Sequence, residues 1–195
     1  MKLKILFLTN NQITNPLCLW LRKKHYKVYK FTKPLNKTIL QKINPDIIIS
    51  YNYKYIIKKE FLTEYYFINL HISYLPFNRG AHPNIWSFIE NTKKGVTIHL
   101  IDEGIDTGDI LVQKRVVLDK KETFKSTYKK LHFHIQMLFK QNFKKIINQK
   151  IKPKQQPKQG TFHISKELPP NIDYSTPIYK ILKEINANRK TQHKR

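Results

Sequence analysis

The chain has 195 residues, of which 40% are hydrophobic and 12% aromatic. This length allows one domain with a sizeable core, and the composition excludes a wholly disordered chain. No apolar run approaches the roughly 20 residues that span a membrane, and KLKILFL at the N-terminus lacks the length and the cleavage site of a signal peptide. Cys18 is the only cysteine, which excludes an internal disulfide. We therefore expect a cytoplasmic protein without a membrane partner.

Lysine and arginine number 37 against 13 aspartate and glutamate residues, which gives a net charge of +24. Such a charge suits a polyanionic partner such as nucleic acid. The excess is mostly lysine, however, whereas arginine is the residue that makes bidentate phosphate and base contacts. The basic residues concentrate after Phe139, and acidic residues outnumber basic ones between Tyr65 and Ile110. We therefore interpret the charge mainly as a solvated surface and do not expect a nucleic-acid partner, although RNA binding stays open.

Short apolar runs alternate along the chain with segments of helical periodicity, which is typical of an α/β sheet. The pattern predicts strands over residues 4–8, 27–31, 46–50, 66–72, 96–101 and 110–118. It predicts helices over residues 16–24, 35–43, 83–90, 122–148 and 177–186. Residues 151–159 are polar and interrupted by proline, so we expect a connector there and a loose basic end over residues 189–195. The predicted division is a domain over 1–150 that carries the chemistry, followed by a connector, final helix and basic tail over 151–195.

Polar side chains alternate along the end of the fourth predicted strand. Asn69, His71 and Ser73 share one face, because successive residues of a strand point to opposite sides. The carboxyl end of such a strand is where open α/β sheets bind ligands. An amide donor and an imidazole at this spacing could hold an oxyanion and move a proton. Alone, the same pattern is more typical of a half-exposed strand with a polar outer face.

A second polar segment, Ile101–Leu111, gathers four carboxylates around Gly104 and Gly108. The spacing differs from that of the helix–loop–helix calcium motif, and the flanking sequence reads as strands. We therefore expect no metal site. The loop is better interpreted as a strand–loop–strand segment that delivers one carboxylate toward His71.

Together, NLHISYLPFNRGAHPN (69–84) and GVTIHLIDEGIDTGDIL (95–111) resemble the family of formyltransferases that use 10-formyltetrahydrofolate. The family's pattern is Asn-x-His-x-Ser-Leu-Leu-Pro, then Arg-Gly, then Gly-Val-Thr and Asp-x-Gly-x-Asp-x-Gly, and only Tyr74 departs from it. The resemblance runs from about residue 46 to 187. It implies a Rossmann-like, open and mostly parallel sheet flanked by helices, and a formyltransferase enzyme.

Carried over by position, the resemblance implies a catalytic trio of Asn69, His71 and Asp106. Asn69 would donate to the oxyanion that forms when an amine attacks the formyl carbon. His71, as a cation, would donate as well and help the folate nitrogen leave. Asp106 would keep His71 protonated and help to remove the amine proton.

The resemblance also implies a folate pocket for 10-formyltetrahydrofolate as the formyl donor, without a metal. Its expected lining comes from the end of the third predicted strand and from the backbone of the acidic loop: Tyr51, Lys54, Tyr55, Ile56, Ile101, Asp102 and Gly104. Of the remaining histidines, we interpret His99 as an ordinary strand residue. His82 lies close enough to the motif to line the pocket, and His163 is a weaker candidate for a substrate contact.

The amine acceptor is inferred from what the chain lacks. Enzymes of this family that act on glycinamide ribonucleotide have a glycine-rich phosphate loop after the first strand, whereas LTNNQITNP (8–16) has no glycine. The methionyl-tRNA enzymes add a C-terminal β-barrel, for most of which this chain has no room. We therefore expect an amino sugar on a nucleotide carrier as the small-molecule substrate. A minimal methionyl-tRNA formyltransferase and a basic RNA-binding protein on the same fold are the alternatives.

Overall fold

Six strands form one mixed sheet in the order β2-β1-β3-β4-β6-β7 in the computed structural model, which describes residues 2–192. The strand bounds are β1 Lys4–Leu8, β2 Lys27–Phe31, β3 Ile47–Ser50, β4 Phe67–His71, β6 Gly95–Leu100 and β7 Ile110–Arg115. Strands β2, β1, β3 and β4 run parallel, whereas β6 is antiparallel to β4 and β7 is antiparallel to β6. The carboxyl ends of β1, β3 and β4 therefore meet at one edge of the sheet.

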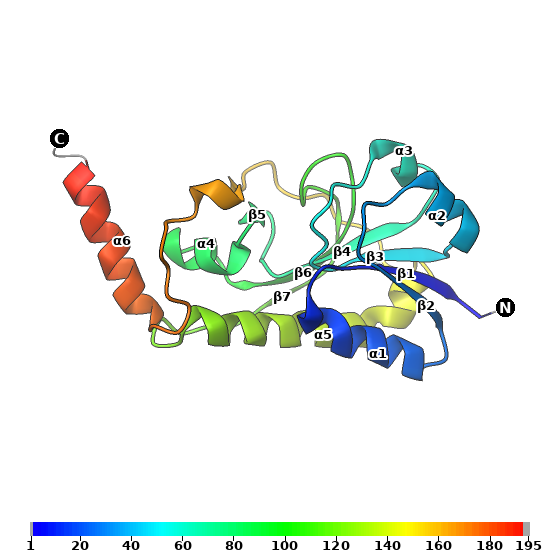
Figure 1. Cartoon of the computed structure of the whole chain (residues 1–195), viewed down its shortest axis with the longest axis horizontal. Helices are drawn as coiled ribbons and strands as arrows, with labels where there is room; N and C mark the ends of the chain where they lie inside the picture. Colours follow the sequence, from blue (N-terminus) through cyan, green and yellow to red (C-terminus); the bar gives the residue numbers. More distant parts are fainter. Residues whose placement is uncertain (1, 193–195) are drawn as a thin grey trace.

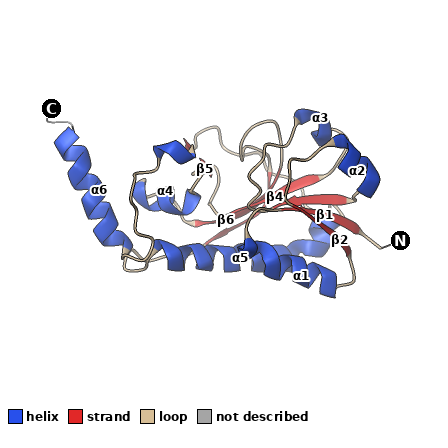
Figure 2. Cartoon of the chain, viewed as in Figure 1, coloured by secondary structure: helices blue, strands red, loops and turns tan. Residues whose placement is uncertain are grey.

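Helices cover both faces of the sheet (Figures 1 and 2). Helices α1 (Asn15–Lys23) and α5 (Phe124–Ile147) lie on one face, and α2 (Lys37–Ile43) and the single turn α3 (Lys59–Leu62) lie on the other. Strand β1 is apolar on both sides because it serves both layers. Ile5 and Phe7 belong to the core cluster under α1 and α5, and Leu6 and Leu8 belong to the cluster under α2.

A third, smaller core lies at the N-terminal end of α5. It joins Ile85 and Phe88 of α4 (Pro83–Ile89) to Phe124 of α5 and to Ile178 and Ile181 of α6 (Ile178–Gln192). Helix α5 begins at a capping box formed by Thr123 and Ser126, which satisfies its first backbone donors. Helix α6 extends away from the sheet (Figure 1). Part of the predicted basic end is helical in α6, and residues 193–195 lie outside the described residues.

Two very short strands and two 3₁₀ turns complete the fold. Strand β5 (Arg79–Gly80) pairs in parallel with β8 (Phe162–His163), and the 3₁₀ turns η1 (Gln12–Thr14) and η2 (Ser165–Glu167) follow β1 and β8. The pattern of the sequence did not predict α3, β5 or β8, because elements of two to four residues have no periodicity to detect. The larger predicted elements are all present, with β7 ending at Arg115 rather than at residue 118. In the described part of the chain, no helix is long and apolar enough to cross a membrane.

Candidate active site

Asn69, His71 and Asp106 lie together at the end of β4. The Asn69 Nδ2 donates to Asp106 Oδ1 at 2.8 Å, and His71 Nδ1 is 3.5 Å from Asp106 Oδ2. Asn69 and His71 reach this point because they are alternate residues of one strand, and Asp106 arrives on the loop between β6 and β7. The structure thus brings together the three residues that the family resemblance implies.

The loop that carries Asp106 is shaped by local hydrogen bonds and by glycine. Asp102 Oδ1 accepts from the Gly104 N–H at 3.2 Å and from the Thr107 hydroxyl at 2.6 Å. A Cβ at Gly108 would overlap the Leu100 carbonyl oxygen, so the chain can turn back so closely only with glycine there. Asp102 therefore shapes the loop, and Asp106 itself adopts a left-handed backbone with φ of 55°.

The Asp106 carboxylate accepts hydrogen bonds on both oxygens. Its Oδ2 accepts from the Gly80 N–H at 2.8 Å, and its Oδ1 accepts from Asn69 and lies 3.4 Å from His99 Nε2. Burial by itself would raise the pKa of Asp106, but the neighbouring imidazoles of His71 and His99 and the Gly80 amide together lower it. Asp106 is therefore an ionised carboxylate at neutral pH.

His71 is buried, and its two ring nitrogens have different partners. Nε2 lies 3.0 Å from the Asn78 carbonyl oxygen, which can only accept, so Nε2 carries a hydrogen and Nδ1 is left facing Asp106. Burial lowers the pKa of His71, and the opposing effect of Asp106 is smaller. The lowered pKa favours a neutral His71 in the resting site, in contrast to the prediction that Asp106 keeps it protonated, because desolvation outweighs the neighbouring charge. A neutral His71 can accept a proton on Nδ1, next to the carboxylate that would stabilise the resulting cation.

His99 belongs to this cluster, whereas its place in the sequence predicts only an ordinary strand residue. It pairs directly with Asn69 in the register of β6 and β4, and it is 2% exposed. Its Nδ1 donates to the Leu100 carbonyl oxygen at 2.6 Å, so Nε2 is free to accept from Asn69 Nδ2 at 3.2 Å. The signal that could have found it is the cross-strand register, which only a three-dimensional pairing of β4 with β6 reveals.

The cluster forms part of the wall of a cavity of about 560 Å³. Six of the seven residues predicted for the folate pocket line this cavity: Lys54, Tyr55, Ile56, Ile101, Asp102 and Gly104. The side chain of Tyr51 is fully buried and does not line it, which corrects that prediction. Tyr51 continues the alternation of β3, so its ring points into the core, where the hydroxyl forms a hydrogen bond with His132 Nδ1. Asn52 and Tyr53, which the sequence analysis missed, line the cavity instead.

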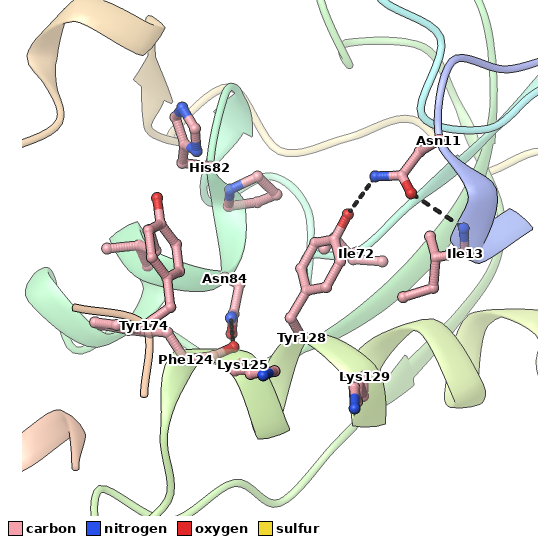
Figure 3. Close-up of a pocket in the computed structure, with 12 residues that line it drawn as sticks. Asn11, Ile13, Ile72, His82, Asn84, Phe124, Lys125, Tyr128, Lys129 and Tyr174 are labelled. Carbon is pink, nitrogen blue, oxygen red and sulfur yellow. Dashed lines mark hydrogen bonds between the residues drawn. The ribbon is translucent and has the colours of Figure 1, made fainter. Parts of the chain in front are cut away.

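A second cavity of about 500 Å³ adjoins the first, and the two share Ile72, His82, Pro83 and Tyr128 as lining residues. In Figure 3, His82 and Tyr174 lie across this cavity from Tyr128. The Tyr128 hydroxyl accepts hydrogen bonds from Asn11 Nδ2 at 3.2 Å and from Asn52 Nδ2 at 3.1 Å. This tyrosine therefore joins the loops that follow β1 and β3 at the boundary between the cavities. His82 lines both cavities, as expected.

His163, the weaker candidate, lines neither of these cavities. Its ring stacks on Trp86 with centroids 3.8 Å apart, and its Nε2 lies 2.8 Å from Glu90 Oε1. The structure therefore gives His163 a role in joining β8 to α4.

A sequence model of the family described as "Formyl transferase" matches residues 8–159. The chain belongs to the formyl transferase family. This membership confirms the resemblance on which the sequence analysis relied, and the sheet order with flanking helices confirms the predicted Rossmann-like fold class.

Solved structures of formyltransferases have the same fold as this chain. The structure of PseJ from Anoxybacillus kamchatkensis, in complex with UDP-4,6-dideoxy-4-formamido-L-AltNAc and tetrahydrofolate, is 39% identical in sequence. It covers 91% of this chain and 96% of its own, with a TM-score of 0.83. A methionyl-tRNA formyltransferase from Clostridium thermocellum gives a TM-score of 0.72 at 21% identity, covering 92% of this chain and 80% of its own, which shows the fold alone.

Curated relatives match over a shorter stretch. The methionyl-tRNA formyltransferase of Caldanaerobacter subterraneus subsp. tengcongensis is 38% identical over 95 residues, which are 47% of this chain and 31% of that protein. The bifunctional polymyxin resistance protein ArnA of Wigglesworthia glossinidia brevipalpis is 42% identical over 95 residues, 47% of this chain and 14% of that protein. The match thus spans a third or less of the length of these relatives.

Proposed function

We propose that this protein transfers the formyl group of 10-formyltetrahydrofolate to the primary amine of an amino sugar carried on a nucleotide. The observation that carries the proposal is the cluster of Asn69, His71 and Asp106, which lies in the wall of one cavity beside a second. The PseJ relative supports it, because its structure contains a UDP-linked formamido sugar together with tetrahydrofolate.

The larger cavity suits a flat, partly apolar donor. Ile56 and Ile105 line it, although they are 82% and 48% exposed, so a ring lying between them would cover apolar surface now in contact with water. Lys54 and Tyr55 line the same wall, with the ammonium 5.0 Å from the ring centroid. These residues fit the pteridine ring of a folate, and the polar cluster lies within the same cavity.

The smaller cavity suits an acceptor that bears phosphate groups. Lys125 and Lys129 line it from successive turns of α5, and among residues 2–192 neither ammonium has an ion-pair partner. Lysine binds phosphate as a point charge, so two ammonium groups one helical turn apart suit a diphosphate. The rest of this lining is mostly apolar or aromatic, as a nucleoside and a deoxygenated sugar require.

The chemistry follows from the protonation states of the cluster. As the acceptor amine bonds to the formyl carbon, an Asn69 N–H turns from His99 to donate to the oxygen that gains negative charge. His71 Nδ1 accepts the proton that the amine loses, and Asp106 stabilises the imidazolium. The same proton then passes from His71 to the folate nitrogen as its bond to the formyl carbon breaks. Folate leaves with the proton and the acceptor keeps the formyl group, so atoms and charges balance.

A minimal methionyl-tRNA formyltransferase is the second candidate, because the curated relatives include such enzymes and the chain carries a charge of +24. The intact cluster gives no support to the third reading, an RNA-binding protein that has lost its chemistry.

The deciding experiment supplies 10-formyltetrahydrofolate together with either a UDP-linked 4-amino-4,6-dideoxy sugar or charged initiator methionyl-tRNA, each at about 150 mM salt. We expect formylation of the sugar alone. Formylation of the tRNA alone would overturn the choice of acceptor, and tight RNA binding with neither product would favour the RNA-binding reading.

A further inference from the structure

Gln156 lies in the segment that returns to the sheet after α5, and its side chain is buried against the loop that carries Asp106. Its Nε2 donates to the Asp106 carbonyl oxygen at 2.9 Å and to the Gly108 carbonyl oxygen at 2.7 Å. The residue is 8% exposed, and both of its amide hydrogens have partners on that loop. The amide therefore fixes the backbone on either side of the turn at residue 107.

The other end of the same amide holds the opposite wall of the site. Gln156 Oε1 accepts from Arg79 Nε at 3.2 Å and from Arg79 Nη2 at 2.8 Å. The next residue, Gly80, donates its backbone N–H to Asp106 Oδ2 at 2.8 Å. Gln156 thus holds Asp106 from two sides. It binds the Asp106 backbone carbonyl directly, and through Arg79 it holds the neighbouring Gly80, whose N–H donates to the Asp106 carboxylate.

Asp106 needs such support because of its backbone. Asp106 has a φ of 55°, in the left-handed region that residues other than glycine adopt only rarely. Without the bonds from Gln156, the loop could relax and turn the carboxylate away from His71. Misplacement of a reacting group by about 1 Å can reduce a rate about 10²-fold.

The segment that presents Gln156 is itself fastened to the site. Lys154 exchanges two backbone hydrogen bonds with Ile110 at the start of β7, at 2.8 and 2.9 Å. Farther along, the Thr161 hydroxyl accepts from the Asn78 backbone N–H at 2.8 Å, and the Asn78 carbonyl accepts from His71. We call residues 154–161 the strap.

We propose that Gln156 is a positioning residue for Asp106. The strap lies in the predicted division 151–195, so the site needs residues from that division as well as from 1–150. Gln156 acts through Asp106 and does not touch the substrate. This inference rests on the proposed function, because it assumes that Asp106 takes part in formyl transfer.

Two variants of Gln156 test the inference, with the exposed neighbour Gln155 as the matched control. Gln156→Leu removes all four hydrogen bonds. Gln156→Glu keeps the shape and an ion pair with Arg79, but it cannot donate to the two carbonyl oxygens. For both variants we expect kcat to fall at least about tenfold, with the KM values for donor and acceptor changed less than about threefold. Gln155→Leu and Gln155→Glu should behave as wild type. A kcat within about twofold of wild type in a folded Gln156→Glu variant would overturn the inference, as would a rise in KM that accounts for the whole loss.

A double-mutant cycle with Asp106→Ala separates this inference from the proposed function. If Gln156 acts through Asp106, Gln156→Leu should reduce the residual rate of Asp106→Ala by less than about twofold. Additive losses would mean that Gln156 acts by another route, and they would overturn the inference alone. If Asp106→Ala itself keeps full activity, the proposed mechanism fails, whatever Gln156 does.

Discussion

At the scale of single residues, the proposed chemistry depends on a neutral His71. Burial lowers the pKa of His71 from its ordinary value of 6.5 more strongly than Asp106 raises it. A base with a lowered pKa is deprotonated, and therefore active, at all pH values above that pKa. We expect log kcat to be flat near pH 7 and to fall with decreasing pH only below pH 6.5.

The variant Asp106→Asn tests the direction in which the Asp106 charge shifts the pKa of His71. It removes the negative charge that raises the pKa of His71. The acidic limb of the pH–rate profile should therefore move to lower pH, in addition to the loss of rate. An acidic limb above pH 7 in the wild type, or a shift to higher pH in the variant, would contradict a neutral His71.

His99 leads to a separate prediction, because it holds one hydrogen of Asn69 and lies beside Asp106. His99→Phe removes a hydrogen-bond acceptor and a neighbour that lowers the pKa of Asp106. We expect kcat to fall about tenfold, the effect of about 1.4 kcal/mol. The half-exposed His134 on α5 gives the control variant His134→Phe. Equal rates for His99→Phe and His134→Phe would show that His99 takes no part in catalysis.

At the scale of elements, the sequence predicts strands well where both faces of the strand are buried, because such strands are runs of apolar residues. IIIS in β3 and ILFL in β1 are continuous apolar runs, as expected of strands buried on both faces. The Asn-x-His spacing and the glycine-bounded loop predict that one carboxylate approaches His71, and the family resemblance was needed to identify it as Asp106. Tyr51 was assigned wrongly because a position near the strand end does not say which face the side chain takes.

The contacts of Gln156 with Asp106 could not be predicted in the same way. The residues are 50 positions apart, and nothing in the local pattern of IKPKQQPKQ distinguishes Gln156 from Gln155. His99 was missed for a related reason, because its partners come from the neighbouring strand. Residues that act through tertiary contacts need the three-dimensional pairing of their elements.

Helix α5 leads to a prediction about the acceptor. Lys125→Gln and Lys129→Gln should each raise the KM for the nucleotide sugar about tenfold, the loss of about 1.4 kcal/mol of binding, while kcat changes little. The effect should decrease at high salt, because exposed charges are screened. Lys130 lies on the same helix, lines neither cavity and pairs with Glu122 at 2.6 Å, so Lys130→Gln is the matched control. An equal KM for all three variants would contradict the proposal that Lys125 and Lys129 bind the diphosphate.

At the scale of the whole molecule, the sheet brings distant parts of the chain to one edge. The two cavities are surrounded by the loops after β1 and β3, the end of β4 and the loop before β7. The strap contacts the loop that carries Asp106 through Gln156. In the proposed mechanism, the acidic middle of the chain supplies the reacting groups, and the lysines of α5 that line the smaller cavity bind the acceptor. Tyr128 and His82 line both cavities, so they lie between the place that we propose for the donor and the place that we propose for the acceptor.

The central claim is that Asn69, His71 and Asp106 transfer a formyl group at the meeting point of these cavities. The most direct test is the single-turnover rate of formyl transfer to the UDP-linked amino sugar by Asp106→Asn and by His71→Ala, compared with the wild type. We expect each variant to be slower by at least about 10²-fold, with folate binding retained. A variant that keeps more than about a tenth of the wild-type rate would contradict the assignment of these residues to the chemistry.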